Sequence, residues 1–232
     1  MQPGKRYRAH SLIELMVAST LLIVLMGSVV LALVNCNNYV RNSETKIDAQ
    51  KQALQSSIWV SRSLSEANIT SATNFTTPAS GVSFPSPRNQ ATGDVAWSSS
   101  TGGALEWRQL KFVYLDQSQD PGCIVVRGYP LYYTGAGVNP AVMWTGFPPF
   151  PANGIYDLGQ IGLQPLSTLV YNSSRPPDKV LGQNIRVFAV DIYRPDDLPS
   201  RASTANIIVE SFAPYYNLDY GIRVVTTARL KN

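Results

Sequence analysis

The stretch from Leu12 to Val34 reads LIELMVASTLLIVLMGSVVLALV, and its only charged residue is Glu14. As an α-helix it would be about 34 Å long, enough to cross a hydrocarbon core of about 30 Å. Three basic residues, Lys5, Arg6 and Arg8, precede it, and uncharged residues follow it. The positive-inside rule therefore places the N-terminus in the cytoplasm and the chain after residue 35 outside.

Other N-terminal apolar segments fit this stretch less well. A cleaved secretory signal has an apolar region of about 7–15 residues and then a small-residue cleavage site. Here the apolar run is longer and is followed by Asn35-Cys36-Asn37-Asn38. A lipoprotein signal needs a cysteine much closer to the leader. A plain single-pass anchor fits the hydropathy but leaves Glu14 unexplained, because intramembrane carboxylates are costly and mark functional positions.

The residues around Glu14 form a specific pattern. Ala9-His10-Ser11-Leu12-Ile13-Glu14-Leu15-Met16-Val17-Ala18 resembles the cleavage and methylation motif of type IV prepilins. In that family a peptidase cuts after a Gly, or less often an Ala, and a Glu occupies the fifth mature position. A cut between Ala9 and His10 makes Glu14 the fifth residue. The resemblance implies N-methylation at His10, although this chain has Ala9 for the usual Gly and His10 for the usual Phe.

A cut between Ala9 and His10 leaves an ammonium group at the start of the helix and a carboxylate, Glu14, one turn later. Both are poorly solvated in a membrane, so the amine of one subunit could pair with Glu14 of a neighbour and set the axial register of packed helices. The segment 11–14 also fits a helix capping box, which would place Glu14 at a helix start without any assembly role.

These features predict an α+β fold of pilin-like type, with a long N-terminal transmembrane and stalk helix packed on an antiparallel β-sheet exterior domain. The predicted divisions are a basic leader at 1–9, a transmembrane helix at 10–34, an amphipathic stalk helix at 35–67 and a β-rich exterior domain at 68–232. In the stalk, the apolar residues recur on one face, which we expect to pack in the intramolecular core rather than on a coiled-coil partner. This stripe consists of Val40, Ile47, Leu54 and Ile58.

The strand pattern is clearest in the second half of the chain. Residues 105–115 and 123–127 should pair as a hairpin, with 129–134 extending the sheet and 185–193, 206–212 and 222–230 completing it. Residues 68–104 and 135–179 are rich in Ser, Thr, Asn, Gly and Pro, which indicates loops. Within 185–193, the odd-numbered positions compete with Phe188, Val190 and Ile192 for the core, so the register stays open.

The net charge and the two cysteines bear on nucleic-acid binding and on a possible disulfide. The formal charge is +4, and the three basic residues before residue 10 account for most of it, so a chain without them carries +1. Net charge therefore gives no reason to expect nucleic-acid binding. Cys36 and Cys123 are 87 residues apart, and we favour two separate thiols over a disulfide.

We do not expect an enzyme, a metal or a cofactor. The only histidine is His10, beside the cut, so no exterior Ser-His or Cys-His arrangement is available. Asp196-Asp197 fits a solvated turn, and Asp116 and Asp120 lack the spacing of a calcium loop. No Gly-Lys-Ser/Thr phosphate loop is present, so energy for assembly would come from an ATPase elsewhere.

The layout further resembles the larger minor components of the prepilin-like family, pseudopilin J of type II secretion and the W-type minor pilins of type IV pili. The resemblance implies a subunit without catalysis of its own, processed by prepilin peptidase and assembled into a pilus-like or secretion filament, at initiation or at the tip. It implies sibling pilins and pseudopilins as partners through the N-terminal helix, where Gly27 and Ser28 offer small surfaces. The chain would be a single-pass inner-membrane protein with its C-terminal domain periplasmic or extracellular.

The alternative is a single-pass anchored exterior binding domain of adhesin type, in which loop aromatics would contact a ligand. Its candidate residues are Tyr132, Tyr133, Trp144, Phe147, Phe150, Tyr215 and Tyr216.

Overall fold

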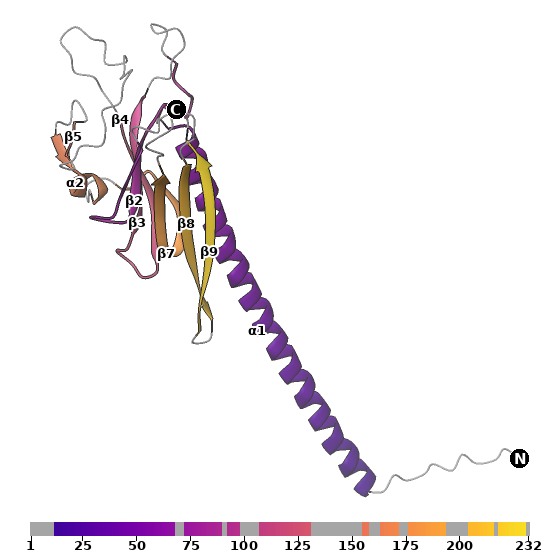
Figure 1. The fold of residues 1–232 in the computed structure, drawn as a ribbon. Helices are drawn as coiled ribbons and strands as arrows, with labels where there is room; N and C mark the ends of the chain where they lie inside the picture. The colour runs from indigo at the N-terminus through magenta and orange to yellow at the C-terminus, as the bar shows by residue number, and fades with distance from the viewer. Residues whose placement is uncertain are drawn as a thin grey trace, which may run out of the picture. The chain divides into compact units, whose positions relative to one another are not determined.

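The structure is a computed structural model that describes residues 12–67, 72–89, 92–97, 107–130, 155–157, 163–171, 176–193, 204–215 and 218–230. Its fold is α+β, with a long N-terminal helix, α1 (Leu12–Ser65), and an antiparallel, curled β-sheet (Figure 1). The chain divides into two compact units, Met1–Thr45 and Lys46–Asn232. The second unit contains the C-terminal part of α1 and all the strands.

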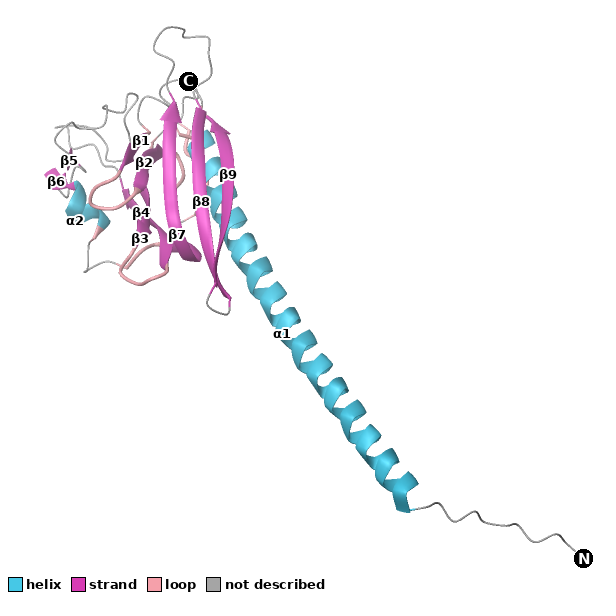
Figure 2. Cartoon of the chain, turned by 60° about the horizontal axis from the view of Figure 1, so that its bottom comes forward, coloured by secondary structure: helices cyan, strands magenta, loops and turns pink. Residues whose placement is uncertain are grey.

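Within the described residues, the main sheet has seven strands in the order β1-β2-β3-β4-β7-β8-β9, and every neighbouring pair is antiparallel (Figure 2). A separate pair, β5 and β6, leads directly into a short helix, α2. The elements are β1 (Thr73–Phe75), β2 (Gly81–Ser86), β3 (Gln109–Asp116), β4 (Gly122–Pro130), β5 (Ile155–Asp157), β6 (Leu163–Pro165), α2 (Leu166–Val170), β7 (Lys179–Tyr193), β8 (Thr204–Tyr215) and β9 (Leu218–Arg229).

The predicted hairpin is present as β3 and β4, and β4 runs on to Pro130, so Tyr129 belongs to it rather than to a separate strand. The loop prediction for 68–104 is wrong, because β1 and β2 lie there. The prediction for 135–179 is also partly wrong, since it contains β5, β6, α2 and the first residue of β7. All six residues of β2 are buried despite their Ser, Pro and Gly content, so pairing and burial override local composition here.

A bulge settles the register of β7. Ile185 pairs with Ser211, but the next pair is Val187 with Glu210, so the extra residue shifts the alternation. Ile185 is buried before the bulge, whereas Phe188 and Val190 are buried after it and Val187 is exposed. Before the bulge an odd-numbered residue faces the core, and after the bulge the even-numbered residues face it.

Small residues form the sheet-facing side of α1. Ala49, Ala53, Ser56 and Ser57 are buried there, together with the larger Val60 and Leu64 nearer the helix end. A Cβ added at Gly182 of β7 would collide with the Ser56 hydroxyl. Helix and sheet thus approach closely, and van der Waals contact replaces large interdigitating side chains.

Hydroxyl groups reinforce this packing. Ser211 Oγ of β8 donates to the Ala49 carbonyl at 2.9 Å in a buried position, and Thr226 Oγ1 of β9 lies 3.2 Å from Ser57 Oγ. The core around them includes aliphatic residues of β4, β7 and β8, among them Ile124, Val190 and Ile207, and the aromatic rings of Phe84 and Phe188. The buried hydroxyls are therefore satisfied rather than left without partners.

The prediction that the stalk stripe packs in the intramolecular core is wrong. Val40, Ile47, Leu54 and Ile58 are 46%, 62%, 45% and 54% exposed. At about 100° per residue, Ser56 lies about 180° from Ile47, whereas Leu54 and Ile58 lie within about 20° of it. The large apolar side chains therefore point away from the sheet, because the small residues occupy the side that faces it.

A second core fills the other face of the sheet beside α2. Phe112 of β3 packs edge-to-face on Tyr129 of β4, with ring centroids 5.9 Å apart. Tyr114 donates to the Val170 carbonyl at 2.6 Å, and Tyr129 donates to the Leu169 carbonyl at 2.7 Å. The two tyrosines thus satisfy carbonyl groups that the last turn of a short helix leaves without intrahelical partners.

The helix ends at Ser65, two residues before the predicted end at Ala67, and Glu66 then forms a bidentate ion pair with Arg88. The Arg88 Nε and Nη2 atoms donate to the Glu66 carboxylate at 2.7 and 2.5 Å. The hydrogen bond from Arg88 is the largest influence that lowers the pKa of Glu66, and burial opposes it. The pair ties the end of α1 to the segment after β2.

Leu64→Ala should lower the free energy of unfolding by about 3 kcal/mol, because it leaves a cavity between helix and sheet where Leu64 is fully buried. Ile58→Ala on the same helix should cost less than about 1 kcal/mol, since Ile58 faces away from the sheet. Denaturant titration of the full chain in detergent, followed by tryptophan fluorescence, measures both. Equal losses would contradict the described orientation of α1.

Glu66→Gln should lower stability by about 1 kcal/mol near neutral pH, the range for a partly exposed bidentate pair. A carboxyl whose pKa is lowered by folding stabilises above its unfolded pKa, and this contribution is lost as the pH falls through the folded pKa. The difference in free energy of unfolding between wild type and variant should therefore shrink below about pH 4.5, the ordinary pKa of a glutamate side chain. Urea titrations between pH 7 and acid pH check this, and a gap that does not change with pH would refute it.

Candidate processing and assembly site

The N-terminal end of α1 places Glu14 in its first helical turn. A carboxylate in that position is stabilised by the positive end of the helix dipole. The predicted cleavage residues, Ala9 and His10, and the capping residue Ser11 lie outside the described residues. The structure therefore describes one member of the predicted motif, Glu14, at the start of the helix.

From Leu12 to Val34, every side chain of α1 is exposed in the isolated chain. Among the helices that the structure describes, α1 is the one long and apolar enough to span a membrane. Its hydroxyl groups are satisfied within the helix, since Ser19 and Thr20 donate to the Met16 carbonyl and Ser28 donates to the Leu25 carbonyl. Glu14 is therefore the one charged side chain of a surface otherwise suited to lipid.

Gly27 lies on this surface, and a Cβ built there would meet nothing within 4 Å. The glycine is therefore not required by packing inside the described part of the chain. A small residue in the middle of an apolar helix does allow another helix to approach closely, as the sequence predicts for Gly27 and Ser28.

The exposed stripe continues beyond the apolar segment. Ile47 follows Val34 by 13 residues, which is about 20 Å of helix, and Ile58 lies about 16 Å further on. Ile47, Leu54 and Ile58 therefore lie outside the apolar run from Leu12 to Val34 in the sequence, and their side chains are exposed in the isolated chain.

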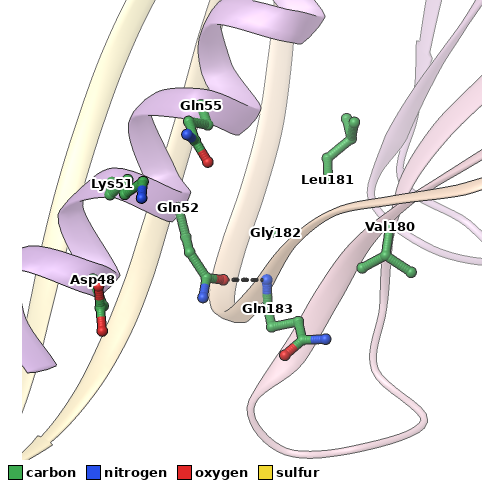
Figure 3. A pocket seen from close by; sticks show the side chains of 8 residues that line it. All are labelled: Asp48, Lys51, Gln52, Gln55, Val180, Leu181, Gly182 and Gln183. Atoms are coloured by element: carbon green, nitrogen blue, oxygen red, sulfur yellow. Dashed lines mark hydrogen bonds between the residues drawn. The ribbon is translucent and has the colours of Figure 1, made fainter.

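A polar cleft of about 430 Å³ separates the side of α1 from β7 (Figure 3). Gln183 donates its backbone N–H to the Gln52 side-chain oxygen at 2.6 Å, which bridges strand and helix. Asp48 and Lys51 are the only titratable side chains in its lining, and both are on α1. The Gln183–Gln52 hydrogen bond attaches β7 to α1 at this cleft. The lining residues are Asp48, Lys51, Gln52, Gln55, Val180, Leu181, Gly182 and Gln183.

The other predicted candidates do not converge on a site. Cys36 and Cys123 are free thiols, and burial raises the pKa of Cys123, so its thiolate is disfavoured. Asp116 accepts a hydrogen bond from the Ser118 N–H at 3.0 Å in the β3–β4 turn. No group of three or more His, Cys, Asp or Glu side chains suited to a metal occurs in the described part of the chain.

Most candidates of the two alternatives lie outside the described residues. These are Asp196-Asp197, considered as a carboxylate pair of an enzyme, and the aromatic residues of the adhesin alternative at 132, 133, 144, 147, 150 and 216. Tyr215 is described only as the last residue of β8.

Sequence reasoning missed a cluster around Trp59. Lys111 of β3 and Lys179 of β7 place their ammonium groups 5.6 and 5.4 Å from the centre of the Trp59 ring. These residues are far apart in the chain and follow no recognisable spacing. The sequence places Trp59 on the stalk helix, but this position does not indicate which strand residues lie beside it.

Comparison of the chain with models of known protein families, with curated proteins and with solved structures found no match. The functional assignment therefore depends on the residues and geometry described above.

Proposed function

We propose that this protein is a prepilin-like subunit, a minor pilin or pseudopilin of pilin-like fold. A prepilin peptidase would cut it between Ala9 and His10, and α1 would then pack it among sibling subunits of a type IV pilus-like or type II secretion filament. The processed chain has an assembly role without catalysis of its own. Its place would be at the initiation of the filament or at its tip.

The observation that carries this proposal is the apolar stripe on α1 that faces away from the sheet. Ile47, Leu54 and Ile58 stay 45–62% exposed, and they lie outside the apolar run from Leu12 to Val34. Burying the exposed part of each would stabilise a complex by about 1 kcal/mol. A simple membrane anchor has no use for such a stripe, whereas a helix packed among other helices does.

Glu14 would supply the register of that packing. After a cut at Ala9, the new N-terminal ammonium lies four residues before Glu14, so the two charges occupy successive helical turns. In an apolar surrounding each charge is costly unless it is paired. Pairing the ammonium of one subunit with Glu14 of its neighbour removes both costs and fixes the axial offset between the two helices.

The anchored binding domain remains the competing function, and processing separates the two. Co-expression with an active prepilin peptidase should remove residues 1–9 and leave one methyl group on His10. Ala9→Leu should block the cut, because the position before the cleaved bond takes a small residue in the prepilin family. The intact mass of the membrane-extracted protein measures both outcomes.

A catalytically inactive peptidase serves as the control and should leave a chain that begins at Met1. If the chain still begins at Met1 with an active peptidase, the prepilin assignment is wrong. The protein would then be a single-pass anchored exterior domain.

The stripe can be tested separately from the fold. Ile47→Lys and Ile58→Lys should change the free energy of unfolding by less than about 1 kcal/mol, because both side chains face away from the sheet. The same variants should sharply reduce recovery of the protein in sheared filaments from cells that express a complete assembly system.

Gln55→Lys is the matched control, since it places the same charge on α1 beside the polar cleft with β7. It should leave filament recovery unchanged. Wild-type recovery of both stripe variants would show that this face of α1 is not an assembly surface.

A further inference from the structure

The strongest unexplained feature of the exterior unit is a cleft of about 370 Å³ built around Trp59. It combines an aromatic ring with three cationic side chains, Arg88, Lys111 and Lys179, and one carboxylate, Asp178. Trp59 comes from α1, Lys111 from β3 and Lys179 from the start of β7. The fold therefore brings these charges together, and the filament proposal makes no use of them.

The sheet register brings the two lysines to the same side of the sheet. Lys111 lies opposite Gly128 in the β3–β4 pair, and Lys179 lies opposite Val126 in the β4–β7 pair. Gly128 has no side chain, and a Cβ there would lie within 2.5 Å of the Gln109 side-chain oxygen. The side chains of Gln109 and Asp178 therefore occupy the room that a larger residue at position 128 would need.

Most polar groups of the cleft already have partners. The Arg88 guanidinium is bound to Glu66 and to the Gly93 carbonyl, the latter at 2.9 Å. Asp178 accepts the Gly128 N–H at 2.5 Å. Gln109 donates its side-chain amide to the Arg88 carbonyl at 2.7 Å. The donors left over in this part of the chain are thus the two lysine ammonium groups.

Both ammonium groups contact the Trp59 ring, at distances typical of cation–π interactions. Within the described residues, the hydrogen bonds and ion pairs give neither lysine an anionic partner. The carboxylates Glu66 and Asp178 act on Lys111 through space and offset part of the positive charge of the cleft. Burial lowers the pKa of Lys111, because its ammonium group has lost part of its hydration.

We propose that this cleft is a binding site for a single carboxylate group, held between the Lys111 and Lys179 ammonium groups beside Trp59. The neighbouring carboxylates Glu66, Asp94 and Asp178 repel a second negative charge, so a monoanion fits better than a dianion such as phosphate. Two ammonium donors suit the two oxygens of a carboxylate. The carboxylate would come either from a small organic acid or from an acidic side chain of another protein.

The full chain in detergent, labelled with ¹⁵N at its tryptophan indoles, provides the readout. Trp59→Phe identifies the Trp59 signal, and titrations at constant ionic strength use acetate, the blocked tripeptide acetyl-Gly-Glu-Gly-amide and inorganic phosphate. We expect the Trp59 signal to shift saturably, with half-saturation at millimolar carboxylate. Tighter binding of the peptide points to a protein-borne carboxylate, and equal binding of acetate points to a free acid.

Lysine variants test the site itself. Lys179→Gln, at an exposed position, and Lys111→Gln should each weaken binding at least about tenfold, while Lys179→Arg should retain it. Lys51→Gln removes the same charge from the cleft between α1 and β7 and should have no effect. Thermal unfolding of each variant verifies the fold, and Lys179→Gln alone is sufficient if Lys111→Gln does not fold.

The pH dependence adds a readout that a purely structural lysine would not give. A bound carboxylate raises the pKa of Lys111, so by linkage affinity should fall as the pH rises through the lowered pKa of the free protein. Glu66 and Asp178 raise that pKa, whereas Arg88 and Lys179 lower it. In Lys111→Gln this fall should disappear below the ordinary lysine range.

Three results would each overturn the proposal: the absence of any saturable Trp59 shift, a shift of unchanged affinity in both lysine-to-glutamine variants, or tighter binding of phosphate than of carboxylate. None of them bears on the cut at Ala9 or on the stripe of α1, so this proposal and the filament proposal can fail separately.

Discussion

Close contact between α1 and the sheet is the constraint on which the rest of the exterior unit depends. Ala49, Ala53 and Ser56 give the helix a flat side, and Gly182 gives β7 a matching one, since any larger side chain there would meet Ser56. Close packing without long side chains depends on van der Waals contact and satisfied hydroxyls rather than on large buried areas. On this helix Val60 and Leu64 are buried against the sheet, whereas Ile47, Leu54 and Ile58 stay exposed on the opposite side.

The helix α1 therefore presents three kinds of surface: one apolar all round, one packed in the core and one exposed aliphatic stripe. From Leu12 to Val34, α1 has an exposed apolar surface that suits lipid. Between Ala49 and Leu64, one side of the helix belongs to the core and the opposite side presents an exposed aliphatic stripe. The proposed filament uses the apolar surface and the stripe together, since neighbouring helices can cover both. Glu14 then has a reason to sit in an apolar segment, because a neighbour's N-terminal ammonium provides the partner that lipid cannot.

The sequence predicted the features that depend on local pattern. The long helix follows from a continuous apolar run, and the β3–β4 hairpin follows from two strand-like runs around a turn. The β1 and β2 strands were missed because their Ser, Pro and Gly residues resemble a loop, and only pairing with β3 makes them strands. The stripe was assigned to the wrong side because periodicity identifies an apolar face but not its partner. The Trp59 cleft depends on pairing between distant strands, which no local pattern encodes.

The separation of small and large residues on α1 also separates folding from assembly. If the stripe had packed in the core, as the sequence suggested, a substitution there would disturb fold and filament together. In the structure the core contact is made by Ala53, Val60 and Leu64, whereas Ile47, Leu54 and Ile58 contribute little to it. The unit that contains the sheet can therefore fold with its stripe exposed, and in the proposed filament burial of the stripe would contribute to association alone. A subunit that must first fold outside the membrane and then join a filament needs this independence, because each step uses a different side of the same helix.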